Sequence, residues 1–389
     1  MSSSRIAVIG LGEAGYEMHL PAIARMRNAR VVGACDVDAA RRARAASRFK
    51  VPVFGDLESM LVEANPEVLI IATPPASHAE LCLRAIESGL NIICEKPFVS
   101  TLDEADEVLA ASRAAGTRIA LNHEFREMPI FRALIEHAGP GSSEGLFFAQ
   151  IWQNTDVPPW TEGGWRGQMQ RRTLHEAGVH LIDYLLALFG EKPVAVWASM
   201  SAGGTHEGGA HDGGADEGGV DEGGVDEGGV DALSIVALEF AGGRLAQVLQ
   251  NRLCKGETHY FEVRADTRVA SYRASFGGRA RITTGLYRST TPHVRLDYGV
   301  SGLAWREIGN TRKLLARNPK EPRVVSTRYV LEKSLAAFDS GGRPPATGED
   351  ARDALEVIDA CYSSAVTGLR TIVGQHDSLR TDKSPQSTQ

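Results

Sequence analysis

Long apolar stretches are missing from the sequence. No run among the 389 residues approaches the roughly 18 uninterrupted apolar residues of a membrane-spanning helix. The first ten residues, MSSSRIAVIG, also lack a cationic segment followed by a long apolar one, which is the pattern of a secretion signal. Both absences argue against a membrane partner and predict a soluble, cytoplasmic protein.

Cysteine is scarce, and its pattern excludes two further classes. The five cysteines form an odd, scattered set without a CxxC or CxxH spacing: Cys35, Cys82, Cys94, Cys254 and Cys361. At least four lie in apolar runs, where a cysteine behaves as a small buried hydrophobe. We therefore expect reduced core thiols, with no disulfide framework and no metal site.

A basic excess is also missing, because 42 Lys and Arg face 49 Asp and Glu, for a formal net charge of −7. Nine of these acids lie between Gly203 and Ala232, in a pentapeptide written six times: GGTHE GGAHD GGADE GGVDE GGVDE GGVDA. The rest of the chain, with 40 acids and 42 bases, is nearly neutral. Nothing in this balance favours nucleic acid as a partner.

The repeat is too rich in glycine and acids to form a packed core, and it falls between two strand-like segments, 194–200 and 232–240. We predict a flexible, solvated insertion at 203–231, in a hairpin loop that tolerates added length. A calcium-binding array is the alternative, but the period lacks the apolar position that would bury each turn.

Length and an apolar content of 43% favour two domains. Residues 1–122 alternate short β-branched runs with helical patterns, which is typical of a Rossmann α/β domain with a parallel sheet. Strands are expected at 5–10, 29–35, 68–73, 91–94 and 118–122, with helices near 14–27, 38–48, 56–64, 77–88 and 101–114. Ser77 with Glu80, and Thr101 with Glu104, read as capping boxes, and Gly89 and Gly116 as helix ends.

Residues 123–375 change to longer strand-like runs with polar alternation. This pattern predicts that the second half forms an α+β domain with a large open, mostly antiparallel sheet. The strands are expected at 146–152, 194–200, 232–240, 244–251, 258–264 and 280–284, with helices at 177–188 and 349–367. The polar tail at 376–389 is expected to be disordered.

The first predicted strand runs directly into a glycine fingerprint, Gly10-Leu11-Gly12-Glu13-Ala14-Gly15. After an apolar strand and before a helix, this pattern binds a dinucleotide: the glycines allow a tight turn, close approach of a pyrophosphate and helix packing. Asp36 ends the second strand, where a carboxylate binds an adenosine ribose and repels a 2′-phosphate, so NAD(H) is favoured. Arg41 and Arg42 nearby keep NADP(H) as an alternative.

Two further loops follow strands of the predicted parallel sheet. One reads Thr73-Pro74-Pro75-Ala76-Ser77-His78, and the other Cys94-Glu95-Lys96-Pro97. Ligands bind at the carboxyl ends of such strands, so Thr73, Pro74, His78, Glu95 and Lys96 are candidate cofactor residues. Spacing alone leaves two interpretations of Lys96 open: a lysine that reaches into the cleft, or a surface ion pair with Glu95.

With these motifs the sequence resembles the Gfo/Idh/MocA oxidoreductases. The resemblance is carried by the glycine fingerprint, His19-Leu20-Pro21, the segment ATPPASHAELCLRAIESGLNIICEKP and, later, GVHLIDYLLALFG. It implies a Rossmann domain, a carboxyl-terminal domain on an open sheet, and homodimers or homotetramers formed through that sheet. It also implies NAD(P)-dependent chemistry on a secondary alcohol or ketone of a sugar, cyclitol or nucleotide sugar.

The same resemblance implies a catalytic set. Lys96 is similar to the family lysine that contacts the reacting hydroxyl, and His180 to the family histidine that exchanges its proton. Asp183 would share a helix face with His180, and Glu176 stands where the family often has an aspartate. By residue type alone, a single histidine on this helix is more often a core or capping residue.

Substrate contacts are implied for His123, Arg126, Trp165 and Arg166, together with Lys96, Glu176 and His180. His123 and Glu124 could form a second acid/base pair or simply pack between the domains. The sequence departs from the family at Arg171 and Arg172, where many members carry glycines. These arginines suit either an anionic substrate or solvent exposure, and solvent exposure is slightly favoured.

The combined prediction is an NAD(H)-dependent dehydrogenase or reductase acting on a polyhydroxylated small molecule. Two alternatives stay open: a glycosidase that uses tightly held NAD to oxidise and re-reduce a sugar, and a non-catalytic dinucleotide-sensing regulator. The presence of both Lys96 and His180 argues against the regulator.

Overall fold

The computed structural model describes residues 3–158, 163–169, 171–203, 230–255, 260–276, 281–285, 293–297 and 302–375. Nearly all of the predicted insertion and the tail at 376–389 lie outside these residues.

The amino-terminal half forms a six-stranded, wholly parallel sheet in the order β3-β2-β1-β4-β5-β6. The strands are β1 Ser4–Ile9, β2 Ala29–Cys35, β3 Val53–Phe54, β4 Val68–Ile71, β5 Asn91–Cys94 and β6 Ile119–Leu121. This order confirms the predicted Rossmann fold. The two-residue edge strand β3 was not predicted, because so short a segment carries no periodic pattern.

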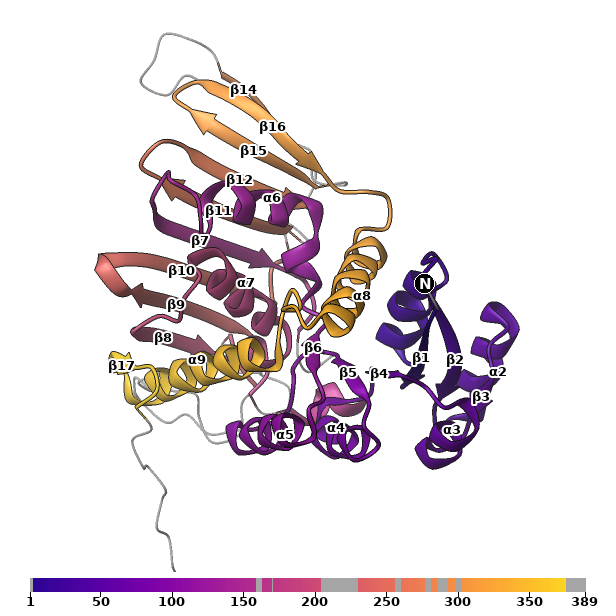
Figure 1. Ribbon diagram of the computed structural model, residues 1–389. Helices are drawn as coiled ribbons and strands as arrows, with labels where there is room; N and C mark the ends of the chain where they lie inside the picture. Colours follow the sequence, from indigo (N-terminus) through magenta and orange to yellow (C-terminus); the bar gives the residue numbers. More distant parts are fainter. Residues whose placement is uncertain are drawn as a thin grey trace, which may run out of the picture.

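Helices pack on both faces of this sheet (Figure 1). They are η1 Gly15–His19, α1 Leu20–Ile23, α2 Ala39–Phe49, α3 Leu57–Ala64, η2 Pro75–Ser77, α4 His78–Glu87 and α5 Leu102–Ala115. The capping box of Thr101 and Glu104 is confirmed, whereas the one predicted at Ser77 is wrong. The Ser77 hydroxyl instead donates to Pro74 O and Thr73 Oγ1.

The carboxyl-terminal half builds a nine-stranded sheet in the order β16-β15-β12-β11-β7-β10-β9-β8-β17. All neighbours are antiparallel except β7 and β10, which confirms the mostly antiparallel prediction. The strands are β7 Leu146–Asn154, β8 Ala195–Ser201, β9 Leu233–Phe240, β10 Arg244–Asn251, β11 Tyr260–Thr267, β12 Ser271–Phe276, β15 Leu303–Ile308, β16 Thr311–Arg317 and β17 Thr371–Ile372. A separate hairpin pairs β13 Arg281–Gly285 with β14 His293–Asp297.

Helices α6 Pro129–Ala138, α7 Val179–Phe189 and α9 Gly348–Thr367 lie over one face of the large sheet (Figure 1). Helix α8 Pro322–Ser340 packs instead against η1, α1 and β5 of the Rossmann domain. Shorter turns are η3 Glu124–Glu127, η5 Gly164–Gln168, η6 Thr173–Gly178 and η7 Ala241–Gly243. Because α8 contacts both these Rossmann elements, η1, α1 and β5, and the turn η3, it brings residues of the second domain to the Rossmann cleft.

The outer face of the nine-stranded sheet, opposite these helices, carries exposed apolar side chains. Trp152, Trp197, Ile235 and Leu245 point to this face from four adjacent strands and are between 41% and 48% exposed. Such a face suits assembly with another sheet. Assembly of the chain through this sheet stays a prediction.

Two expectations from the sequence, the lack of membrane-spanning segments and of disulfides, can be compared with the described part of the chain. None of its helices is long and apolar enough to cross a membrane. All five cysteines are free thiols, four of them buried and Cys254 half-buried, as expected for reduced core residues.

The position of the repeat supports a deletion experiment. Ser201 and Leu233 are directly paired across β8 and β9, and Ala232 N donates to Ser201 O at 2.9 Å. Deleting 203–229 would leave Ala202, Val230, Asp231 and Ala232 to join the strands, a length within the roughly 2–5 residues of common hairpin loops. We expect the melting temperature and the affinity for NAD to stay close to wild type, measured by thermal denaturation and fluorescence titration. A large loss of either would show that the repeat contributes to the fold or the site.

Candidate active site

The glycine loop is shaped by close backbone contacts. Gly10 has φ +94°, and a Cβ there would lie 2.4 Å from Ala72 O. A Cβ at Gly15 would lie 1.9 Å from Gly10 O, whereas at Gly12 the nearest atom is Arg41 Nη1 at 4.0 Å. Gly10 and Gly15 are therefore required by the turn itself, and Gly12 leaves open space where a pyrophosphate can approach the backbone.

A cavity of about 890 Å³ begins at this loop and is closed by residues of the second domain. Its lining includes most of the predicted cofactor residues, namely Gly10, Gly12, Glu13, Ala14, Asp36, Thr73, Pro74, Glu95 and Lys96. From the other side come Glu124, Trp165, Arg166 and Arg323. Its size and the cradle at Gly12 fit an extended dinucleotide, because Asp36, the glycine loop and Lys96 all line the same cavity.

Asp36 supports the glycine loop as well as lining the cavity. Its Oδ2 accepts from Leu11 N at 2.8 Å and its Oδ1 from Asp38 N at 2.9 Å. Arg42 donates to the carbonyl oxygens of Asp36 and Val37, so its guanidinium is already engaged. These contacts hold a carboxylate where a ribose would bind, which is the arrangement expected for NAD.

His78 does not line the cavity, contrary to the prediction from its loop. It is fully buried; its Nε2 lies 2.9 Å from Thr73 O and its Nδ1 2.9 Å from Pro97 O. The imidazole thus ties the loop after β4 to the loop after β5. It fixes the backbone of both cofactor loops and is not available to a ligand.

Glu95 is the buried centre beneath Lys96. Its Oε1 lies 2.7 Å from His19 Nε2 and accepts from Asn122 Nδ2 at 2.7 Å. Burial alone would raise the pKa of Glu95, but His19, Asn122 and Lys96 outweigh it and lower the pKa to about 2. Glu95 therefore stays ionised and holds the strand end that carries Lys96.

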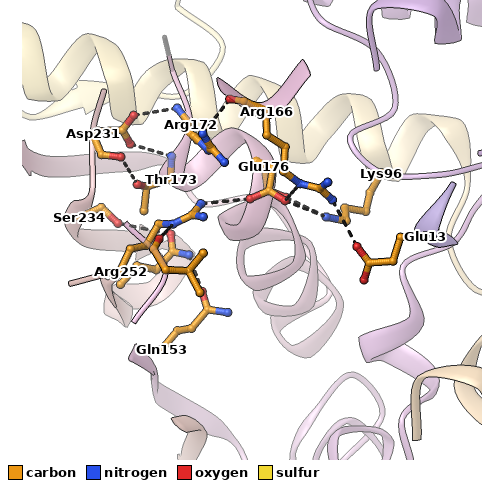
Figure 2. A network of polar contacts seen from close by, with 12 residues as sticks. Glu13, Lys96, Gln153, Arg166, Arg172, Thr173, Glu176, Asp231, Ser234 and Arg252 are labelled. Atoms are coloured by element: carbon orange, nitrogen blue, oxygen red, sulfur yellow. Dashed lines mark hydrogen bonds and ion pairs between the residues drawn. The ribbon is translucent and has the colours of Figure 1, made fainter. Parts of the chain in front are cut away.

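Lys96 and Glu176 meet across the two domains (Figure 2). Lys96 Nζ donates to the carbonyl oxygen of Glu176 at 3.0 Å and lies 4.0 Å from its Oε1. The Glu176 carboxylate also accepts from Arg252 Nη1 at 3.1 Å and from Arg166 Nε at 3.3 Å. Burial opposes ionisation of Glu176, yet Lys96, Arg252 and Arg166 prevail and lower its pKa to about 2. Its carboxylate is thus a fixed negative charge that positions cations.

The segment that carries Glu176 is fixed by Asp231 (Figure 2). The Asp231 carboxylate accepts from Arg172 N at 2.7 Å, from Thr173 N at 2.9 Å and from the Tyr362 hydroxyl at 3.1 Å. Asp231 is only 1% exposed, so the predicted insertion extends one residue too far. Asp231, the last acid of the repeat, is part of the folded domain, where three hydrogen-bond donors satisfy its buried carboxylate.

The arginines that depart from the family pattern do not line the cavity. Arg172 is fully buried and donates to Arg166 O at 2.8 Å, so the favoured expectation of solvent exposure is wrong for it. Arg171 lies at the surface, 3.4 Å from Asp359. Neither residue is placed to bind an anionic substrate in this cavity.

His180 lies in the first turn of α7, 8% exposed, and its ring stacks on Phe125 with 4.6 Å between centroids. Its Nδ1 is 3.7 Å from Glu124 Oε2, and it is Glu124 that lines the cavity. Burial, then the nearby charges of Lys96, His123 and Arg323, hold the pKa of His180 well below its usual value. The imidazole is therefore neutral near pH 7.

Arg126 and His123 are interior residues, contrary to their predicted contact with substrate. Arg126 binds both oxygens of Asp183, at 2.8 and 2.6 Å, and reaches Asp350 at 3.2 Å. The His123 ring is buried 3.5 Å from the same Asp183 carboxylate. Asp183, predicted to share a face with His180, is engaged by Arg126, and this cluster joins η3 to α7 and α9.

Arg323 and Arg252 are site residues that sequence reasoning missed. Arg323 lies at the start of α8, and its Nη1 donates to Glu13 Oε1 at 3.1 Å; both residues line the cavity. Arg252 follows β10 and holds Glu176. Neither belongs to a local motif, so only the packing of distant segments brings them to the site.

A parallel sheet with a glycine loop, a carboxylate after its second strand and a lysine in the same cavity define a two-domain, dinucleotide-dependent oxidoreductase. The comparisons with known families agree. Residues 4–123 match "Oxidoreductase family, NAD-binding Rossmann fold", and residues 146–270 match "GFO/IDH/MocA C-terminal domain". The chain belongs to the GFO/IDH/MocA family and is an NAD-dependent oxidoreductase.

Characterised relatives are distant. The chain is 24% identical over 367 residues to D-apiose dehydrogenase of Paraburkholderia graminis, and this alignment covers 94% of this chain and 88% of the relative. It is 25% identical over 195 residues to D-glucoside 3-dehydrogenase of Escherichia coli, and this alignment covers 49% of this chain and 56% of the relative. Several other curated relatives are likewise matched over only about half of their length.

Solved structures share the fold over nearly the whole chain. An oxidoreductase from Agrobacterium radiobacter in complex with NAD+, L-tartaric acid and magnesium has a TM-score of 0.72 at 17% identity, covering 96% of this chain and 99% of that one. The WlbA dehydrogenase from Bordetella pertussis in complex with NADH and UDP-GlcNAcA has a TM-score of 0.72 at 16% identity, with the same coverage. At such identities the likeness establishes the fold.

Proposed function

We propose that the protein interconverts a secondary alcohol and a ketone on a polyhydroxylated small molecule: a sugar, a cyclitol or a nucleotide sugar. The observation that carries this proposal is the position of Lys96, which follows the carboxyl end of β5 and lines the same cavity as the glycine loop. Relatives named for sugar dehydrogenation, such as D-apiose dehydrogenase, support the substrate class.

The residues at this end of the cavity suit hydroxyl chemistry. Bound NAD would supply a hydride acceptor, or NADH a hydride donor, at its nicotinamide. Lys96 contacts the carbonyl and carboxylate of Glu176, and these contacts support a role in which its ammonium would donate a hydrogen bond to the reacting oxygen. Oxidation breaks the carbinol C–H bond with its electron pair and the O–H bond as a proton, so a base must receive that proton.

The glycine loop, Asp36 and the Thr73-Pro74 turn would hold the dinucleotide, since they line one continuous cavity with Lys96. Trp165 and Arg166 close the cavity from η5, with the Arg166 guanidinium 4.6 Å from the centre of the Trp165 ring. A flat apolar ring beside a cation suits a polar substrate with one apolar face.

A panel of sugars, cyclitols and nucleotide sugars, offered with NAD+ and, as ketones, with NADH, tests the proposal by absorbance. We expect stoichiometric formation or loss of NADH with at least one compound. Glycosidic cleavage without net NADH would instead indicate the redox glycosidase. Binding of NAD+ without turnover in either direction across the panel would overturn the proposal, and tighter binding of NADP+ would overturn the role of Asp36.

A further inference from the structure

Two buried polar atoms face each other at the wall of the cavity without hydrogen-bond partners. Glu124 begins η3, three residues after the end of β6, is 2% exposed and lines the cavity. Its Oε2 and the Nδ1 of His180 are 3.7 Å apart, and within the described residues neither atom has a partner. Buried polar groups are nearly always paired, so two facing orphans indicate a pair that forms during function.

The pair is placed between the cavity and the protein interior. Glu124 Oε1 lies 3.8 Å from Arg323 Nε, and Arg323 is in turn anchored by Glu13. On the far side the His180 ring is stacked on Phe125 and cannot turn away without losing that contact. A movement of less than about 1 Å would bring Glu124 Oε2 and His180 Nδ1 within hydrogen-bond distance.

Titratable groups on the neighbouring elements act on this pair: Glu95 and Lys96 after β5, His123 before η3 and Arg323 on α8. Burial raises the pKa of Glu124 to about 7, with Glu95 acting in the same direction and Arg323 and Lys96 against it. Since His180 stays neutral, Glu124 is the member of the pair that gains and loses a proton near pH 7.

Resting on the function proposed above, we infer that Glu124 takes up and releases the substrate proton, and that neutral His180 orients its carboxyl group. In oxidation the hydroxyl O–H bond breaks and the proton binds the Glu124 carboxylate, while the hydride leaves with its electron pair for the nicotinamide and the C=O bond forms. The Nδ1 atom of His180 can donate to the carboxylate in one tautomer and accept from the carboxylic acid in the other. The histidine thus stabilises both proton states of Glu124.

The other carboxylates near Lys96 are less suited to this role. Glu176 is held ionised by three cations, and Glu95 accepts from His19 and Asn122. Asp183 lies in the interior with Arg126. Among the acids that the structure describes around Lys96, Glu124 alone combines a place on the cavity wall with a proton affinity near neutrality.

The test compares Glu124→Gln and Glu124→Asp with Glu127→Gln, a matched control on the same turn. Glu127 binds Lys333 at 2.7 Å and does not line this cavity. Infrared difference spectra of the NAD-bound proteins between about pH 6 and about pH 8 report carboxyl protonation directly, because ordinary glutamates titrate near about 4.3. We expect a carboxylic acid band at the lower pH in wild type and Glu127→Gln that is missing in Glu124→Gln. An unchanged band in Glu124→Gln would overturn the inference.

Kinetics with a substrate from the panel give the second readout. Glu124→Gln should lower kcat by about 100-fold or more while the KM for NAD changes little, and should abolish the limb of the kcat profile near pH 7. Glu124→Asp should recover part of kcat and restore a titrating limb. A wild-type pH profile in Glu124→Gln would overturn the inference. Because the infrared band needs no substrate, failure of the whole panel would count against the proposed function and leave the assignment of Glu124 to be decided by the band.

Discussion

Replacing Lys96 with methionine should lower kcat by roughly 10²–10⁴-fold, the range for loss of a group that assists proton transfer. Methionine keeps the length of the side chain but removes the ammonium that lies 3.0 Å from Glu176 O and 4.0 Å from its carboxylate. The affinity for NAD should change only a few-fold, because the glycine loop and Asp36 are untouched.

The measurement is steady-state turnover of a substrate from the panel, together with NAD binding followed by tryptophan fluorescence. Lys255→Met is the matched control, since Lys255 is exposed and pairs with Asp156 away from the cavity. Nearly unchanged turnover in Lys96→Met would remove this lysine from the mechanism. An equal loss in Lys255→Met would show that the effect on turnover does not depend on the position of Lys96 in the cavity.

The Rossmann half could be predicted because its signals are local. Buried parallel strands read as β-branched runs, and turn glycines and caps mark their ends. Helix α8 was missed because its buried face includes Ser326, Thr327 and Ser334, so the apolar periodicity that indicates a helix is broken. Ser326 Oγ donates to Pro322 O at 2.6 Å, and Thr327 Oγ1 accepts from Asn122 Nδ2 of the Rossmann half at 3.4 Å; no local pattern reveals the second partner.

The site residues also fall into those that local sequence predicts and those that only tertiary packing brings together. Asp36, Thr73 and Lys96 follow different strands, and their meeting could be predicted because the carboxyl ends of parallel strands share one edge. Arg323 and Glu13 are in contact across 310 residues of chain, and only the docking of α8 brings them together. For Arg126 the local signal was present but misleading. Its position after the last Rossmann strand suits a substrate contact, but the burial of Asp183 beside it requires a cation there.

The glycine loop allows folding and cofactor binding to be separated by two single substitutions. Gly15→Ala should destabilise the protein by about 2–4 kcal/mol, because the new Cβ would lie 1.9 Å from Gly10 O and one backbone segment must move. Gly12→Ala meets no atom closer than 4.0 Å, and Gly12 is not among the glycines with positive φ. Its stability should therefore stay within about 1 kcal/mol of wild type.

For the affinity for NAD, in contrast to stability, the large effect should come from Gly12→Ala. A methyl group at Gly12 would occupy the space through which the pyrophosphate approaches the backbone, so the affinity should fall roughly 100-fold, a loss of about 2.7 kcal/mol. Thermal denaturation without cofactor and calorimetric titration with NAD+ measure the two effects on the same samples. If Gly12→Ala binds NAD as wild type does, the dinucleotide does not lie against this turn. If Gly15→Ala is as stable as wild type, the close contact with Gly10 O does not constrain the loop, and the tight turn would have to be maintained by Gly10 alone.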